Sequence, residues 1–152
     1  MENNKSNKKS HKEKIGWREW CALPNLKIKK IEAKVDTGAS TSAMHAKIIS
    51  ITEDNGKKYI KFKVFSDRKN SLSSKICTAE LFAERFVMSS NGISEKRFII
   101  KTRVVVGRTE FDTEIGLTDR APLRFRMLLG RSALKRRFVI DPALAHVQGK
   151  PF

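Results

Sequence analysis

The sequence predicts an all-β protein built as one globular domain. Many short β-prone runs are separated by turns rich in Gly, Asn, Asp and Ser, whereas helical periodicity is weak. A hydrophobic fraction of 39% and nine Phe residues can form a buried core, and 152 residues suit a single domain. Many short strands joined by turns favour a barrel or a sandwich, and the strand pattern leaves both open.

The first residues differ from the rest of the chain. Residues 1–14, MENNKSNKKSHKEK, are polar and charged, so we expect a disordered basic tail followed by one domain over residues 15–152. This start lacks the apolar segment of a secretory signal peptide. The chain also lacks a run of about 18 apolar residues, which a membrane span would need. We therefore expect a cytoplasmic protein with no membrane partner.

Two β-hairpins are expected in the middle of the chain. Residues 46–65 contain the turn Asp-Asn-Gly at 54–56, after which apolar residues alternate with lysines. In residues 97–117, three consecutive valines lead into Gly107, and apolar or Thr side chains then alternate with acidic residues or Gly over residues 110–117. Between these hairpins, the Ser-Ser-Asn-Gly sequence at 89–92 marks another turn.

The last third predicts a strand, a short helix and a final strand. Residues 125–134, FRMLLGRSAL, form an apolar run that should end as a strand at Gly130, with a short helix after it. Residues 136–147 contain one more β-prone run, which Pro142 interrupts because proline cannot donate a ladder hydrogen bond.

Charge and metal-binding residues limit the classes of function. The formal net charge of +16 would attract anions such as nucleic acids, ribosomes or acidic polypeptides, but no recognisable nucleic-acid module accompanies it. Cys21 and Cys77 are too few for a disulfide framework, so we expect ordinary thiols. His11, His45 and His146 are scattered and have no metal-ligand spacing. No metal and no cofactor are expected.

The stretch VDTGASTS, at residues 35–42, places a carboxylate at the end of a predicted strand. Apolar residues alternate up to Val35, and small or hydroxylated residues follow Asp36. Asp-Thr-Gly is also common turn chemistry, in which Gly38 permits positive φ and the Asp accepts local backbone hydrogen bonds. The buried strand and the small neighbours favour a partly desolvated carboxylate surrounded by hydrogen-bond donors.

KVDTGAS, followed later in the chain by RMLLGRSAL, resembles the two signatures of retropepsin-type aspartic proteases. The resemblance implies a closed barrel with one lobe per chain, a flap hairpin and a short C-terminal helix. It assigns the catalytic acid to Asp36 and the rest of the active-site loop to Thr37, Gly38, Ala39 and Thr41. It assigns the segment that supports this loop to Gly130 and Arg131, and the flap to Ser89, Ser90, Asn91 and Gly92.

A narrower resemblance covers roughly residues 15–146. IGWREWCALPNLKIKKIEAKVDTGASTSAMHA, SSNGISEKRF, LTDR and FRMLLGRSAL…FVIDP are similar to a bacterial retropepsin-like family often labelled ATP-dependent zinc proteases. That family is associated with a RimK-type ligase that adds glutamates to a ribosomal protein. The chain has neither a Walker-type loop for ATP nor a helix presenting paired histidines to zinc. Ser40 stands where the family usually has a basic residue, which leaves the partner of Arg131 open.

The mechanism of this class requires two carboxylates. About 3 Å apart, they cannot both ionise and so share one proton. The sequence has one Asp-Thr-Gly, and neither Asp119 nor Asp141 repeats its setting. We therefore expect an obligate homodimer in which two copies of Asp36 meet on the two-fold axis. Thr37 would hydrogen-bond across the paired loops, and Gly38 would admit the substrate backbone.

The expected substrate is an acidic, glutamate-rich polypeptide such as an oligoglutamate tail. A ribosomal protein is among the partners that this substrate class suggests. The net charge of +16 and the family's link to glutamate ligation both favour this class. Candidate cations for the substrate carboxylates are Arg97, Arg120 and Arg124. His45 is expected to have a structural or substrate-side role.

Two other functions stay open at this point. The main alternative is a non-catalytic module of the same fold that binds RNA or ribosomes through its basic surface, which the intact Asp-Thr-Gly-Ala disfavours. A metal-dependent peptidase is a more distant alternative.

Overall fold

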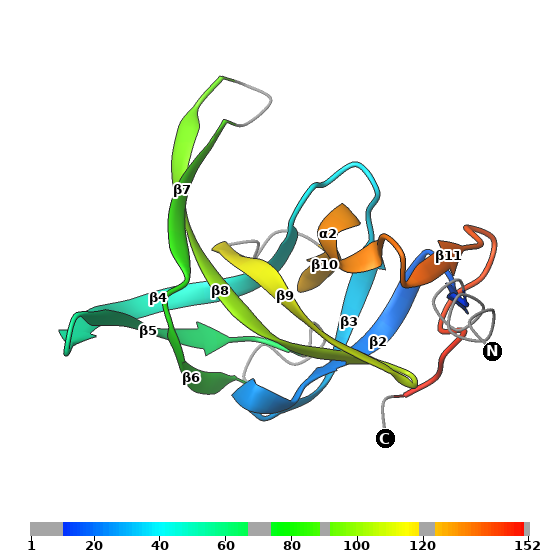
Figure 1. The fold of residues 1–152 in the computed structure, drawn as a ribbon, viewed down its shortest axis with the longest axis horizontal. Helices are drawn as coiled ribbons and strands as arrows, with labels where there is room; N and C mark the ends of the chain where they lie inside the picture. Colours follow the sequence, from blue (N-terminus) through cyan, green and yellow to red (C-terminus); the bar gives the residue numbers. More distant parts are fainter. Residues whose placement is uncertain (1–10, 67–73, 89–91, 119–123, 151–152) are drawn as a thin grey trace, which may run out of the picture.

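The computed structural model describes residues 11–66, 74–88, 92–118 and 124–150 (Figure 1). The elements are β1 (Glu13–Ile15), β2 (Arg18–Leu23), the 3-10 helix η1 (Pro24–Leu26), β3 (Ile28–Val35), β4 (Ser42–Asp54), β5 (Lys57–Val64), β6 (Lys75–Glu80), β7 (Ala83–Met88), β8 (Ser94–Val106), β9 (Thr109–Thr118), β10 (Met127–Leu129), α2 (Arg131–Leu134) and β11 (Phe138–Ile140). No helix in the described part of the chain is long and apolar enough to cross a membrane. The prediction of a β protein with one short C-terminal helix is confirmed.

The main sheet closes on itself through the short strand β10. Its order is β10-β3-β2-β8-β9-β4, and β10 also pairs with β4, so hydrogen bonds run around a ring. β10 is parallel to β3, with Leu129 opposite Val35, and antiparallel to β4, with Met127 opposite Met44. The closed barrel that the family resemblance implied is therefore confirmed, and the sandwich is excluded.

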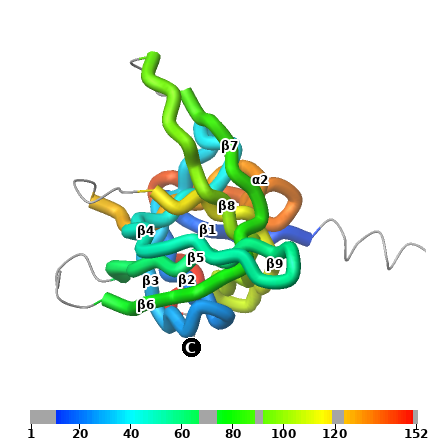
Figure 2. Tube along the Cα trace, turned by 90° about the vertical axis from the view of Figure 1, so that its left-hand side faces the viewer, coloured from blue at the N-terminus to red at the C-terminus, as the bar shows by residue number. Residues whose placement is uncertain are grey.

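Two long strands extend from the ring and carry hairpins. Residues 42–45 of β4 pair in parallel with β9, and residues 46–54 pair with β5, beyond which lies β6. Residues 94–99 of β8 pair with β7, and residues 98–106 pair with β9. Figures 1 and 2 both show the hairpin of β7 and early β8 rising away from the barrel.

The turns between strands follow the chemistry expected from sequence. Asn55 and Gly56 join β4 to β5 with φ of 53° and 79°, the positive values that a tight hairpin turn needs. Gly107, with φ of 58°, joins β8 to β9. Both predicted hairpins are confirmed, although β4 and β8 start earlier than the sequence pattern indicated.

The barrel interior is filled by apolar side chains from the ring strands. Fully buried members include Ile31 on β3, Met44 on β4, Ile100 on β8, Ile115 on β9 and Met127 on β10. Because every strand of the ring contributes, this single core fixes the strand that ends at the Asp-Thr-Gly loop.

The N-terminal boundary needs a correction. Residues 1–10 lie outside the described residues, but Glu13 and Lys14, expected in the disordered tail, form β1 together with Ile15. β1 runs parallel to β11 with Glu13 opposite Phe138, and Ile15 is fully buried. The composition of this segment alone predicts disorder. The segment is ordered because Ile15 is buried and because β1 pairs with β11, near the other end of the chain. β11 ends just before Pro142, as expected.

Candidate active site

Asp36 lies at the end of β3, where the strand leaves the barrel. Val35 N–H donates to the Trp17 carbonyl, and Asp36 N–H donates to the Leu129 carbonyl at 2.9 Å. The start of the loop is therefore held by neighbours on both sides of β3. The Asp36 side chain is half-buried.

The loop folds back on its own carboxylate. Gly38 N–H donates to Asp36 Oδ1 at 2.9 Å, and Ala39 N–H donates to the Asp36 carbonyl at 3.3 Å. A Cβ at Gly38 would lie 3.1 Å from Asp36 Oδ1, so a larger residue there would crowd the carboxylate. The local turn and the partly desolvated acid, which the sequence offered as alternative explanations, occur together.

The segment after β10 holds the loop from below. Gly130 approaches so closely that a Cβ there would lie 2.7 Å from the Thr41 carbonyl carbon and 3.0 Å from the Ala39 carbonyl oxygen. The first N–H groups of α2 have no partner within the helix, and two of them donate to loop carbonyls. The donor of Ala39 O is Arg131 N–H at 2.8 Å, and that of Ser40 O is Ser132 N–H at 3.0 Å.

Arg131 has a backbone partner. Its Nη1 donates to the Thr37 carbonyl at 2.8 Å, so the guanidinium holds the loop without any charged residue at position 40. This contact answers the question that Ser40 raised. Thr37, Gly38 and Ser40 remain exposed on the outer side of the loop, whereas Ala39 and Thr41 are partly buried.

The predicted flap residues follow β7 in the chain, and β7 pairs with β8 as a hairpin. Ser89, Ser90 and Asn91 lie outside the described residues, and Gly92 lies two residues before β8 with φ of 82°. At the base, an ion pair of 2.6 Å joins Arg85 of β7 to Glu114 of β9. Near the tip, large apolar side chains are exposed, among them Phe86, Met88 and Ile93.

These features can be compared with known proteins. The family model described as "Retropepsin-like aspartic endopeptidase RimB" matches residues 14–151. The chain belongs to this RimB-like family. The family and enzyme class expected from the Asp-Thr-Gly and Gly-Arg motifs are thereby confirmed.

Curated relatives contain a similar segment within longer proteins. A probable alpha-L-glutamate ligase of Desulfotalea psychrophila is 38% identical over 136 residues, covering 90% of this chain and 29% of that protein. One from Shewanella pealeana is 35% identical over 136 residues, covering 90% of this chain and 30% of the relative. The chain thus spans only 29% to 30% of the length of these relatives.

The fold is shared with a solved structure. A crystal structure of a protein of unknown function (DUF785) from Legionella pneumophila subsp. pneumophila str. Philadelphia 1 superposes with a TM-score of 0.74. The match covers 91% of this chain and 99% of that one, at 24% sequence identity. At this identity the likeness concerns the fold alone.

The structure places the candidate substrate arginines of this RimB-like chain on separate features. Arg97 lies on β8 at the flap base, where its Cδ would be 2.8 Å from a Cβ at Gly116, and its buried Nε has no hydrogen-bond partner. Arg124 lies beside Phe125 in a groove on the outer face of β2 and β3, with its guanidinium 5.4 Å from the ring centroid. Arg120 lies outside the described residues.

The histidines serve as packing or ion-pairing groups. His45 is buried on β4, its ring stacks on Phe65 at 5.2 Å, and its backbone N–H donates to the Arg126 carbonyl. His146 contacts Glu32 at 2.6 Å. Within residues 11–66, 74–88, 92–118 and 124–150, no three His, Cys, Asp or Glu side chains gather closely enough to hold a metal ion.

Sequence reasoning missed two supporting residues. Ser42 Oγ accepts the Gly130 N–H at 3.1 Å, which joins the end of the loop to the supporting segment. Glu19 is fully buried, and its carboxylate accepts N–H groups from Gly16, Val147 and Gln148 at 2.8 to 3.1 Å. Ser42 was visible as a hydroxyl directly after the loop, but no local pattern marks Glu19, because its donors come largely from the other end of the chain.

Proposed function

We propose that this RimB-like chain is an aspartic endopeptidase that works as a homodimer and hydrolyses peptide bonds in glutamate-rich polypeptides. The observation that carries the proposal is the partial burial of the Asp36 carboxylate and the way its loop is held. Asp36 is a half-buried carboxylate on a loop whose carbonyls are held by Arg131 and Ser132, while the Thr37 and Gly38 side of the loop faces outward. A single acid so rigidly held suits a site that a second copy completes.

In this dimer, two Asp36 carboxylates approach to about 3 Å and share one proton. The ionised carboxylate takes a proton from water, and the water oxygen attacks the carbonyl carbon of the peptide bond. The protonated carboxyl group hydrogen-bonds the carbonyl oxygen as negative charge develops there. The tetrahedral intermediate then collapses when the C–N bond breaks and the leaving nitrogen takes a proton from a carboxyl group.

The β7–β8 hairpin is the proposed flap. It projects from the barrel, is tied to β9 at its base by Arg85 and Glu114, and exposes apolar side chains near its tip. Closing this hairpin over a bound peptide would exclude water from the reacting bond.

The proposed substrate class follows from charge and from the relatives. A protein with a net charge of +16 attracts acidic chains, and a segment similar to this one occurs within proteins named probable alpha-L-glutamate ligase. Oligoglutamate tails, including those on a ribosomal protein, are therefore the proposed substrates.

The test combines hydrolysis with mass in solution. Asp36→Asn should lower the turnover of α-linked oligoglutamate by at least about 1,000-fold while leaving a dimer in sedimentation analysis. Asp54→Asn, at the exposed end of β4, is the matched control and should behave as wild type. Undiminished turnover by Asp36→Asn, or full activity in a monomer, would refute the mechanism.

A panel of peptides of equal length tests the substrate class. Oligoglutamate should be cut in preference to oligolysine and to mixed sequences of equal length. Equal rates on all three would remove the proposed specificity. A protein that cuts none of them but binds RNA with a steep salt dependence would instead be the non-catalytic alternative.

A further inference from the structure

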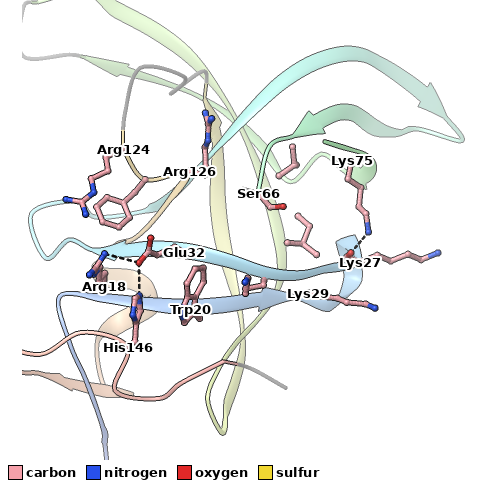
Figure 3. A pocket seen from close by; sticks show the side chains of 14 residues that line it. Arg18, Trp20, Lys27, Lys29, Glu32, Ser66, Lys75, Arg124, Arg126 and His146 are labelled. Atoms are coloured by element: carbon pink, nitrogen blue, oxygen red, sulfur yellow. Dashed lines mark hydrogen bonds and ion pairs between the residues drawn. The ribbon is translucent and has the colours of Figure 1, made fainter. Parts of the chain in front are cut away.

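A groove of about 700 Å³ runs along the outer face of β2 and β3, outside the barrel and separate from the Asp36 loop (Figure 3). One end is formed by Arg18, Glu32 and His146, with residues 124–126 above them. The other end lies at Lys27 and the residues that follow it. The groove therefore follows β3 backwards from a point four residues before Asp36.

The groove is strongly cationic. Its basic side chains are Arg18, Lys27, Lys29, Lys30, Lys75, Arg124 and Arg126. Among the described residues that line it, Glu32 supplies the one carboxylate. Glu32 is mostly buried and is contacted by Arg18 Nη1 at 3.3 Å and by His146 Nε2 at 2.6 Å. This acid is thus already paired, and no other carboxylate among the described lining residues offsets the positive charge of the groove.

Several cations of this groove have no carboxylate partner among the described residues, in contrast to those of the flap hairpin. On the flap hairpin, Arg85 and Lys96 form ion pairs with glutamates at 2.6 and 2.9 Å. In the described part of the chain, no carboxylate pairs with Lys27, Lys29 or Arg126, and the Nε of Arg126 is buried without a hydrogen-bond partner. The side chains of Lys27 and Lys29 are exposed, so their ammonium groups can donate to the carboxylates of a bound chain.

The aromatic rings of the groove favour carboxylates over nucleic-acid bases. The Trp20 ring stacks on the His146 ring with centroids 5.1 Å apart. The Lys30 ammonium lies over the Trp20 ring, 4.8 Å from its centroid. Phe125 is buried and contacts the edge of Trp17 and the guanidinium of Arg124. Binding of single-stranded nucleic acid relies on open rings on which bases stack. These rings already have partners.

We propose that this groove is a second substrate site, which binds an extended, carboxylate-rich stretch of polypeptide away from the bond that is cut. This inference rests on the proposed function for its choice of oligoglutamate. At about 3.3 Å per residue, the groove begins about 13 Å and ends about 30 Å from Asp36 along β3. A tetraglutamate is thus too short to occupy both sites, whereas a dodecaglutamate is long enough.

The binding experiment uses full-length Asp36→Asn protein, which cannot cut the probe. Fluorescence anisotropy of labelled α-linked dodecaglutamate should show about tenfold weaker binding for Lys27→Gln/Lys29→Gln, equivalent to about 1.4 kcal/mol. The matched control is Lys47→Gln/Lys61→Gln, which removes two exposed lysines of β4 and β5 that do not line the groove. The control variant should change the affinity for dodecaglutamate by less than about twofold. Both double variants should keep the thermal unfolding midpoint of the Asp36→Asn protein.

A kinetic experiment with active enzyme separates this site from the catalytic one. The Lys27→Gln/Lys29→Gln variant should raise KM for dodecaglutamate about tenfold and leave kcat unchanged. Its kcat/KM for tetraglutamate should equal that of the wild type. Equal losses for the groove and control variants, or no loss for either, would overturn the groove assignment while leaving the proposed function intact.

Failure of the proposed function would look different. If wild type cuts no oligoglutamate, that proposal falls, and the binding experiment on Asp36→Asn still decides whether the groove takes carboxylates. If an oligouridine of equal charge displaces dodecaglutamate at a lower concentration than unlabelled dodecaglutamate does, the ligand class is wrong and RNA is the occupant.

Discussion

Replacing Gly130 by Ala tests how tightly the supporting segment holds the active-site loop. A Cβ at this position would lie 2.7 Å from the Thr41 carbonyl carbon, 2.8 Å from the Thr41 oxygen and 3.0 Å from the Ala39 oxygen. All three are backbone atoms, so no side-chain rotation can relieve the contact. The φ of Gly130 is −93°, which Ala adopts freely, so the effect comes from crowding alone.

The magnitude follows from two terms. Overpacking in a closely packed site costs about 1–3 kcal/mol. If the loop moves away, the hydrogen bonds from Arg131 and Ser132 to loop carbonyls and from Gly130 to Ser42 weaken, each worth about 1 kcal/mol. A loss of about 2–4 kcal/mol should lower the thermal midpoint by about 5–15 °C for a domain of this size.

The assay pairs thermal unfolding with peptide hydrolysis. Gly130→Ala should lower both the midpoint and kcat, because the same contact supports the fold and positions Asp36. Gly56→Ala is the control, since its Cβ would meet nothing within 4 Å and only its φ of 79° opposes the change, costing about 1 kcal/mol. A Gly130→Ala protein with unchanged midpoint and turnover would refute the reasoning that this contact fixes the loop.

Two further predictions concern buried groups outside the loop. Glu19→Ala leaves the N–H groups of Gly16, Val147 and Gln148 without their acceptor and should lower the free energy of unfolding in urea by about 3–5 kcal/mol. Glu19→Gln keeps one acceptor oxygen and should lose clearly less, so equal losses for the two variants would contradict the hydrogen-bonding role. Burial, reinforced by the Glu19 charge, raises the pKa of the Cys21 thiol, and burial raises that of Cys77 although nearby Lys75 lowers it. The reactive thiolate is therefore scarce at pH 8, and both thiols should react with a disulfide reagent far more slowly in the native protein than in guanidinium; equal rates in the two states would show that the thiols are accessible.

The sequence was most informative where local chemistry decides the structure. Asn55-Gly56 and Gly107 specified their turns because positive φ restricts which residues fit. Asp36 was recognisable because an alternating apolar strand leads directly into small residues. The Gly130-Arg131 motif also predicted the contact with the Asp36 loop, although nothing in the intervening sequence indicates that the two segments meet.

The remainder depends on contacts between distant segments. The parallel pairings of β3 with β10 and of β4 with β9 have no local signal, because their register is set by the shared core. Glu13 and Lys14 have a polar composition and become a strand only because β11 is beside them. The backbone partner of Arg131 could not be inferred either, since sequence patterns identify charged partners more readily than carbonyl groups.

The placement of β10 also affects how the protein reaches its folded state. The strand that completes the ring follows all the other ring strands in the chain, and it must enter between two strands that precede it by many residues. Until it does, β3 and β4 each present an unpaired edge that can recruit a strand from another molecule. Refolding should therefore be slow, since distant pairings delay the rate-limiting step, and its yield should fall as protein concentration rises.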